Sequence, residues 1–303
     1  MKRILVTGGT GFIGRRLCQQ LSQLGWSITV LSRKPEADVK AICGRVEPVA
    51  KLLTLNGGPG FDAVINLAGE GIADKRWSER RKQVLRASRI DLTDQLVANM
   101  ASWEQKPDVL VSGSAVGFYG DQGDQPVDED TKPHLEFTHE LCRDWELAAL
   151  KAGELGVRVC LSRTGIVAGP GGGFLQRMLL PFKLGVGGRL GNGQQYMPWV
   201  HREDVVSALL WMLDNADTCG AYNVVSPTPV TNREFTACLA AQLHRPAFLP
   251  APAFALQLLL GDMARLLLTG QKALPTRLLD QGFKFRYVQL ADALADAAGG
   301  PKP

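Results

Sequence analysis

Short apolar segments alternate with helix-spaced apolar positions through the first half of the chain. Short, largely apolar segments have the length of buried strands and lie at 3–6, 27–31, 62–67, 108–112 and 156–161. Apolar residues at helical spacing predict helices over 12–24, 80–100 and 136–152. Residues 35–61 are mixed and predict no definite element. Buried strands that alternate with helices predict a parallel sheet covered on both faces.

Beyond Thr164 the chain becomes richer in glycine. A glycine-rich turn occupies 169–173, and five glycines fall within 185–193. The later pattern predicts a helix, a strand and a helix at 202–213, 222–225 and 232–243, then a proline-punctuated bend at 246–252 and two further helices. We therefore predict an α/β fold, a Rossmann-type doubly wound parallel sheet with a smaller C-terminal substrate lobe.

The domain boundary is soft because no linker separates the two parts. We place the Rossmann-type domain at 1–228, with an excursion into the substrate lobe around 170–200. The small C-terminal domain is then 229–303.

The first strand runs directly into a glycine-rich turn that opens a helix. The turn consists of Thr7, Gly8, Gly9, Thr10, Gly11, Phe12, Ile13 and Gly14. Side chains at Gly8 and Gly11 would block a phosphate, and Gly14 lets the helix pack tightly on the sheet. The helix N-terminus offers free N–H groups and partial positive charge. The turn predicts a dinucleotide site, the alternative being an ordinary glycine-rich turn.

The end of the second strand favours one dinucleotide. NAD binders usually carry an acid there to hold the ribose hydroxyls. This chain has Ser32, Arg33 and Lys34 instead. A guanidinium and a hydroxyl suit a 2′-phosphate, which a carboxylate would repel. We predict NADP(H) as cofactor, the alternative being that these cations are merely solvated.

Composition narrows the class of protein and its partners. The chain has 303 residues, 45% of them hydrophobic, and 34 Lys and Arg against 30 Asp and Glu. A small excess of +4 spread along the chain predicts no nucleic-acid partner. The most apolar stretch, 253–268, is interrupted by Gly261, Asp262 and Arg265, so we expect no membrane span. The start of the chain passes straight into a strand, so we expect a cytoplasmic location. His134 and His139 lack metal-ligand spacing, and we predict no metal.

Several motifs together carry a resemblance to a known family. They are Thr7–Gly14, 66–70 (Asn-Leu-Ala-Gly-Glu), Arg76-Trp77, Ser88-Arg89, 198–201 (Pro-Trp-Val-His) and a C-terminal run from Pro250 through Phe285. The chain resembles the atypical extended short-chain dehydrogenase/reductases, in the NAD-dependent epimerase/dehydratase-like family. The resemblance implies a Rossmann-type fold and NADP(H) binding, and it names no substrate. It also implies that Leu67 and Ala68 line the cofactor. Without it, these two residues could equally be strand core. Arg89 could reach the cofactor phosphates.

The usual catalytic pair of the superfamily is missing. Its chemistry needs Tyr and Lys at i and i+4 on one helix, because the Lys lowers the pKa of the Tyr. On 136–152 the matching positions hold Leu141 and Trp145, which belong to an apolar stripe. A hydride transfer here would need another acid.

Few other side chains can replace that acid. Ser114 follows the fifth strand, where the superfamily keeps a serine that bonds the substrate oxygen. Tyr119 is either a proton donor or a packing residue at a loop base. His201, beside Tyr196, is either a proton shuttle or a structural hydrogen-bonder. Loop 185–193, with Arg189, could close over an anionic ligand.

Two functions remain open at this point. The first is an NADPH-dependent oxidoreductase or epimerase that acts on a small polar molecule. The second is a non-catalytic NADP(H)-binding redox sensor or scaffold. The sequence also leaves open whether the chain forms a homodimer.

Overall fold

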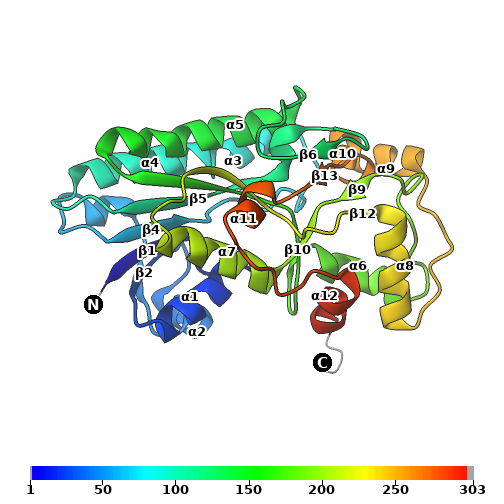
Figure 1. Ribbon diagram of the computed structural model, residues 1–303, viewed down its shortest axis with the longest axis horizontal. Coiled ribbons are helices and arrows are strands. Elements are labelled where there is room, and N and C mark those ends of the chain that lie inside the picture. Colours follow the sequence, from blue (N-terminus) through cyan, green and yellow to red (C-terminus); the bar gives the residue numbers. More distant parts are fainter. Residues whose placement is uncertain (1, 299–303) are drawn as a thin grey trace.

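The computed structural model describes residues 2–298. Its centre is a seven-stranded parallel sheet in the order β11-β7-β5-β4-β1-β2-β3 (Figure 1). The strands are β1 (Arg3–Thr7), β2 (Ser27–Leu31), β3 (Glu47–Val49), β4 (Ala63–Asn66), β5 (Val109–Ala115), β7 (Arg158–Thr164) and β11 (Gly220–Val224). The strand order reverses between β1 and β4, and this reversal opens a crevice at the carboxyl edge of the sheet.

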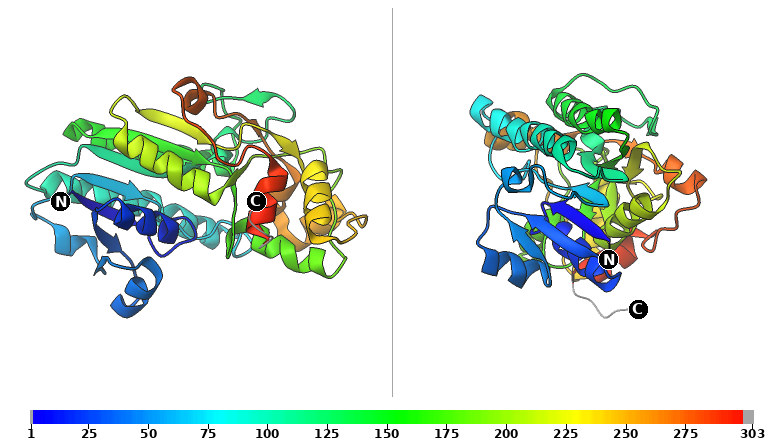
Figure 2. Two further views of the ribbon diagram at one scale, coloured as in Figure 1. Left: turned by 60° about the horizontal axis from the view of Figure 1, so that its bottom comes forward. Right: turned by 90° about the vertical axis from the view of Figure 1, so that its left-hand side faces the viewer.

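Helices cover both faces of this sheet, as the right-hand view of Figure 2 shows. One face carries α1 (Gly14–Gln23), α2 (Glu36–Cys43) and α7 (Arg202–Asp214), and the other carries α3 (Glu79–Ala87), α4 (Ile90–Ser102) and α5 (Phe137–Leu150). Successive residues of β1 point to opposite faces: Ile4 and Val6 join the core under α1 and α7, and Leu5 joins the core under α4 and α5. The predicted doubly wound fold is confirmed.

One prediction about local structure needs correction, and one segment without a prediction is now defined. The single helix expected over 80–100 is two helices, because a turn at Ser88 and Arg89 separates α3 from α4. The break turns Ser88 and Arg89 toward the loop after β4, where the Ser88 hydroxyl accepts from the Glu70 N–H at 3.1 Å. The segment 35–61, which predicted nothing definite, holds α2, β3 and a 3₁₀ turn at Leu52–Leu55.

A smaller lobe packs at the carboxyl edge of the sheet. Its core lies between α6 (Gly173–Lys183), α8 (Asn232–Leu243) and α12 (Leu290–Ala297). The lobe therefore takes α6 from the middle of the chain, within the predicted excursion. Its other helices are α9 (Ala253–Leu260), a 3₁₀ turn at Gly261–Ala264, α10 (Arg265–Leu268) and α11 (Thr276–Asp280).

Short strand pairs attach the lobe to the sheet domain. They are β8 (Ile166–Ala168) with β10 (Trp199–His201), β9 (Tyr196–Met197) with β12 (Val230–Thr231), and β6 (Pro126–Val127) with β13 (Lys272–Ala273). The last pair joins segments far apart in the chain and anchors the final third beside the sheet (Figure 1).

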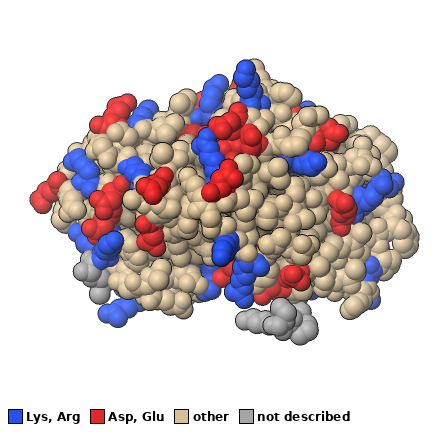
Figure 3. Space-filling view, viewed as in Figure 1, with Lys and Arg blue, Asp and Glu red and all other residues tan. Residues whose placement is uncertain are grey.

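Acidic and basic side chains are interspersed on the face drawn in Figure 3, and they are sparser toward the lobe than over the sheet domain. Within residues 2–298, no helix is both long and apolar enough to cross a membrane.

Candidate functional site

The glycine turn has the backbone geometry that a phosphate needs. Gly8 has φ +70°, and a Cβ there would lie 2.5 Å from the Leu67 carbonyl oxygen. A Cβ on Gly14 would lie 2.2 Å from the Gly8 carbonyl oxygen. Gly11 is exposed, and its N–H donates to the Gly8 carbonyl at 2.9 Å. The turn thus lies tight against the sheet and presents the start of α1 to solvent, a cradle that fits a pyrophosphate.

A buried hydrogen-bond network fixes the strand ends beneath this turn. The Thr7 hydroxyl donates to Asn66 Oδ1 at 2.6 Å and accepts from the Ala68 N–H at 3.2 Å. Asn66 Nδ2 donates to the hydroxyls of Thr93 and Ser112 at 2.9 and 3.2 Å. Sequence reasoning selected Thr7 but missed Asn66 and Thr93, because no local motif shows that β1, β4, β5 and α4 meet there.

The cations after β2 are available to a ligand. The Arg33 side chain is 89% exposed and bonds Glu70 Oε1 at 3.0 Å. That hydrogen bond lowers the pKa of Glu70. The Ser32 hydroxyl accepts from the Lys34 N–H at 3.2 Å. An exposed guanidinium held beside the loop after β4 fits a 2′-phosphate at this edge.

Arg89 lies at the other side of the loop after β4. Its Nη2 donates to the Glu70 carbonyl at 2.9 Å, and its guanidinium lies 5.3 Å from the Trp145 ring centre. A Cβ on Gly69 would approach the guanidinium to 2.9 Å. Arg89 therefore holds this loop in place through the Glu70 carbonyl, at the crevice where the cofactor is expected.

Phe12 is the contact between the glycine turn and the excursion. Cβ atoms on Gly172 and Gly173 would come within 2.6 and 2.8 Å of its ring, and the guanidiniums of Arg15 and Arg202 lie 5.5 and 5.0 Å from the ring centre. The glycine run at 169–173, for which the sequence offered no function, is the surface that accepts this ring.

The two catalytic candidates share one buried network. The Ser114 hydroxyl donates to Glu146 Oε1 at 2.6 Å, and Arg163 bonds both oxygens of Glu146 at 2.8 and 2.9 Å. Arg163 also donates to the Tyr119 hydroxyl at 2.9 Å, which in turn donates to Asn223 Oδ1 at 2.7 Å. Tyr119 is fully buried, and burial raises its pKa to about 12. This geometry favours the packing role for Tyr119.

The helix positions expected to hold the Tyr–Lys pair are buried. Leu141 is 1% exposed in a cluster with Trp77, Leu85 and Met263. Trp145 is 7% exposed, and its indole N–H donates to the Thr93 hydroxyl at 3.1 Å. Neither side chain carries a group able to move a proton to a substrate.

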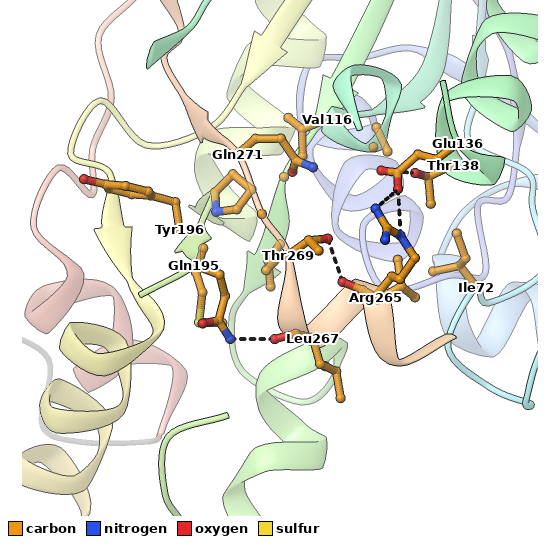
Figure 4. Close-up of a pocket in the computed structure, with 18 of the residues that line it drawn as sticks. Ile72, Val116, Glu136, Thr138, Gln195, Tyr196, Arg265, Leu267, Thr269 and Gln271 are labelled. Atoms are coloured by element: carbon orange, nitrogen blue, oxygen red, sulfur yellow. Dashed lines mark hydrogen bonds and ion pairs between the residues drawn. The ribbon is translucent and has the colours of Figure 1, made fainter. Parts of the chain in front are cut away.

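A cavity of about 400 Å³ lies at the carboxyl edge of the sheet (Figure 4). We call it the sheet-edge cavity. Its floor is formed by Ala115, Val116 and Thr164 at the ends of β5 and β7, and one wall by the start of α5. Its roof is the segment 262–271. This volume and position are typical of a small-molecule site in a doubly wound fold.

Ion pairs hold the roof to the sheet domain. Arg265 bonds Glu136 Oε2 through Nε and Nη2 at 2.9 and 2.6 Å, as Figure 4 shows. Lys82 Nζ lies 3.2 Å from Asp262 Oδ2. The cations near the cavity therefore already have carboxylate partners.

His201, Tyr196 and Arg189 lie in different surroundings. His201 is fully buried against Tyr287 and does not line the sheet-edge cavity. Burial lowers its pKa to about 4. Tyr196 lines the sheet-edge cavity, but Figure 4 shows its hydroxyl directed away from Arg265 and Glu136. Arg189 is exposed and also lies outside the lining of the sheet-edge cavity. Among residues 2–298, no group of three or more His, Cys, Asp or Glu side chains could hold a metal ion.

The reversal of strand order, the glycine turn and the cavity at the same sheet edge define a Rossmann-type α/β protein with a separate, smaller lobe. Residues 4–225 match the family model described as the NAD dependent epimerase/dehydratase family, and residues 251–297 match a domain of unknown function, DUF1731. The chain belongs to the NAD dependent epimerase/dehydratase family.

Relatives cover nearly all of the chain. An Arabidopsis thaliana protein, the chloroplastic SDR39U1 homolog of the epimerase family, is 41% identical over 96% of this chain and 85% of its own length. The human epimerase family protein SDR39U1 is 37% identical over 97% of this chain and 99% of its own.

Solved structures agree with this assignment. A crystal structure of human SDR39U1 with NADPH has a TM-score of 0.89 at 35% identity and covers 99% of this chain and 100% of that chain. A nucleoside-diphosphate sugar epimerase from Corynebacterium glutamicum has a TM-score of 0.79 at 29% identity, and covers 98% of this chain and 58% of that chain.

Proposed function

We propose that this chain binds NADP(H) and acts as an oxidoreductase on a small molecule held in the sheet-edge cavity. The observation that carries the proposal is the preformed phosphate cradle at Gly8–Gly14. A relative of 35% identity, similar over 99% of the chain, was crystallised with NADPH. The cavity at the same edge of the sheet supports a second, substrate-sized ligand.

In this proposal each part of the crevice holds one part of the cofactor. Backbone N–H groups at the start of α1 bind the pyrophosphate. Ser32 and Arg33 bind the 2′-phosphate. Leu67 and Ala68 line the cofactor, and Arg89 fixes the loop above them. Bound NADPH supplies a hydride, and the protein orients the substrate and provides a proton.

The proton comes from a side chain other than the usual tyrosine. Tyr119 gives its hydrogen to Asn223, and Ser114 gives its hydrogen to Glu146. Neither Ser114 nor Tyr119 lines the sheet-edge cavity. The hydroxyls and thiol that line the sheet-edge cavity belong to Thr138, Thr164, Thr269, Tyr196 and Cys142. Burial raises the pKa of Cys142 to about 12, which keeps it protonated.

A non-catalytic NADP(H)-binding sensor is the second candidate. The burial of Leu141 and Trp145 supports it, because the helix that normally supplies the proton relay is here a packing surface.

Two measurements on the purified protein separate these candidates. NADPH should bind stoichiometrically in a fluorescence titration under either candidate. Oxidation of NADPH is then followed with a panel of carbonyl compounds. Turnover with any of them supports the oxidoreductase, whereas tight binding without turnover supports the sensor. Absence of NADPH binding would refute both.

A further inference from the structure

A second cavity adjoins the sheet-edge cavity. It measures about 450 Å³, and we call it the apolar chamber. Four apolar residues line both cavities: Phe174, Leu190, Leu266 and Leu267. The two cavities therefore share an apolar wall.

The lining of the apolar chamber has almost no polar side chain. Residues from α6, from the loops at 186–190 and 249–251, and from 260–267 contribute aliphatic, aromatic, proline, alanine or glycine surface. Arg177 is the one charged lining residue, and its guanidinium bonds Asp74 and the Ala73 carbonyl. A polar ligand would lose its hydration in this chamber without gaining hydrogen bonds.

The chamber opens at the surface. Val186 and Leu249 both line it and are 58% and 49% exposed. The mouth lies between the end of α6 and the loop before α9. Neighbouring side chains in the sequence are also apolar and exposed, with Phe248 at 75% and Leu184 at 68%.

The sheet-edge cavity has the complementary character. Thr138, Thr164 and Gln271 add polar side chains to its lining. Its cations, Lys82 and Arg265, are paired with carboxylates, so they offer little to a diphosphate. The pair of cavities therefore differs from a site for a nucleoside-diphosphate sugar, which would bring two phosphates needing free cations.

We propose that the substrate of this protein is an amphiphile whose long apolar chain occupies the apolar chamber and whose carbonyl-bearing head occupies the sheet-edge cavity. Reduction of the head group rests on the proposed function, in which the cofactor lies at the sheet edge beside the sheet-edge cavity. Binding of the ligand's apolar chain depends only on the apolar chamber.

The first test uses methyl ketones of increasing length, from butanone to dodecanone, titrated calorimetrically into the NADPH-loaded protein. Each added methylene should tighten binding about fourfold until the chamber is full, since a buried methylene contributes about 0.8 kcal/mol. Affinity that does not change with chain length would overturn the proposal. So would binding of UDP-glucose that displaces the longest ketone.

Two substitutions locate the chain in the chamber. Val186→Trp should fill the mouth and weaken binding of the longest ketone by about tenfold or more, while leaving butanone unchanged. Leu249→Arg tests the same place with a charge and should act in the same direction. Leu184→Trp is the matched control, because Leu184 is also largely exposed but lines neither cavity. Equal effects of Val186→Trp and Leu184→Trp would overturn the assignment.

The outcomes separate this inference from the function on which it rests. Ketone binding that depends on chain length, without NADPH oxidation, supports the chamber and refutes the oxidoreductase. NADPH oxidation with short carbonyl compounds that is indifferent to chain length supports the oxidoreductase and refutes the chamber.

Discussion

At the scale of single residues, we propose that the end of β2 selects NADPH over NADH. Arg33 is almost free of protein contacts apart from Glu70. Arg33→Ala should weaken NADPH binding by about tenfold to a hundredfold, since hydrogen bonds to charged groups contribute about 1.5–3 kcal/mol. NADH binding should change little. Fluorescence titrations with both cofactors measure this, with Lys40→Ala on α2 as the control. An equal loss for the two cofactors would show that Arg33 does not bind the 2′-phosphate.

Two glycines of the turn should respond differently to substitution. Gly11→Val places its side chain at the exposed phosphate cradle, where a Cβ meets only the Gly8 carbonyl at 3.1 Å. The variant should fold with a near-native far-UV circular dichroism spectrum and lose cofactor binding. Gly14→Ala drives a Cβ to 2.2 Å from the same oxygen and should destabilise the fold itself. If Gly11→Val still binds NADPH, the turn is only a structural element.

At the scale of elements, α5 buries Leu141 and Trp145, the two positions that correspond to the missing Tyr–Lys pair. Trp145 contacts β5 closely, since a Cβ on Gly113 would lie 3.0 Å from its ring. Trp145→Ala should cost about 3–5 kcal/mol of unfolding free energy through the cavity it leaves. NADPH affinity should remain. Chemical denaturation and cofactor titration test the two expectations together.

Trp26→Ala, at a half-buried tryptophan outside α5, serves as the comparison and should cost less. A stable Trp145→Ala protein with much weaker NADPH binding would instead place this indole beside the nicotinamide. Replacing Leu141 by Tyr and Trp145 by Lys should not create a reductase, because the lysine would be buried without a partner.

The elements that the sequence predicts well are those with strong local periodicity. The runs at 3–6 and 27–31 are largely apolar because their strands are buried on both faces, and they are found as β1 and β2. The helix break at Ser88 and Arg89 was not predictable from periodicity, because apolar spacing continues through it. Its cause is tertiary: both side chains bond the loop after β4.

The same distinction between local and tertiary causes applies to the residues of the candidate site. The glycine turn is recognisable because its constraint is local. The network of Ser114, Glu146, Arg163 and Tyr119 depends on contacts between residues up to 44 positions apart, so the sequence offered the serine and the tyrosine without their partners. The apolar chamber is assembled from α6, the loops at 186–190 and 249–251, and the segment 260–267, and it leaves no sequence motif.

At the scale of the whole molecule, the lobe and the sheet domain meet around one buried histidine. His201 ends β10, and its Nδ1 accepts from the Glu203 N–H at 3.3 Å at the start of α7. Its Nε2 lies 3.3 Å from Asp296 on α12, and its ring stacks on Tyr287 at 3.8 Å. Burial has the largest effect on its pKa, which falls from the ordinary 6.5 to about 4, although Asp296 and Glu203 act in the opposite direction and Arg202 in the same direction.

This depressed pKa predicts how stability depends on acidity. The folded state holds His201 neutral, whereas the unfolded state binds a proton near 6.5. The stabilisation is therefore complete above pH 6.5 and is lost progressively as the pH falls toward 4, at about 3 kcal/mol in total. His201→Asn keeps an acceptor for the Glu203 N–H but cannot titrate. Between pH 6.5 and pH 4, the unfolding free energy of His201→Asn should therefore fall by about 3 kcal/mol less than that of the parent protein. His134→Asn, at an exposed histidine, should keep the parent's dependence. Denaturant titrations across this range decide the matter, and an unchanged slope in His201→Asn would mean that another group sets the acid stability of the junction between the lobe and the sheet domain.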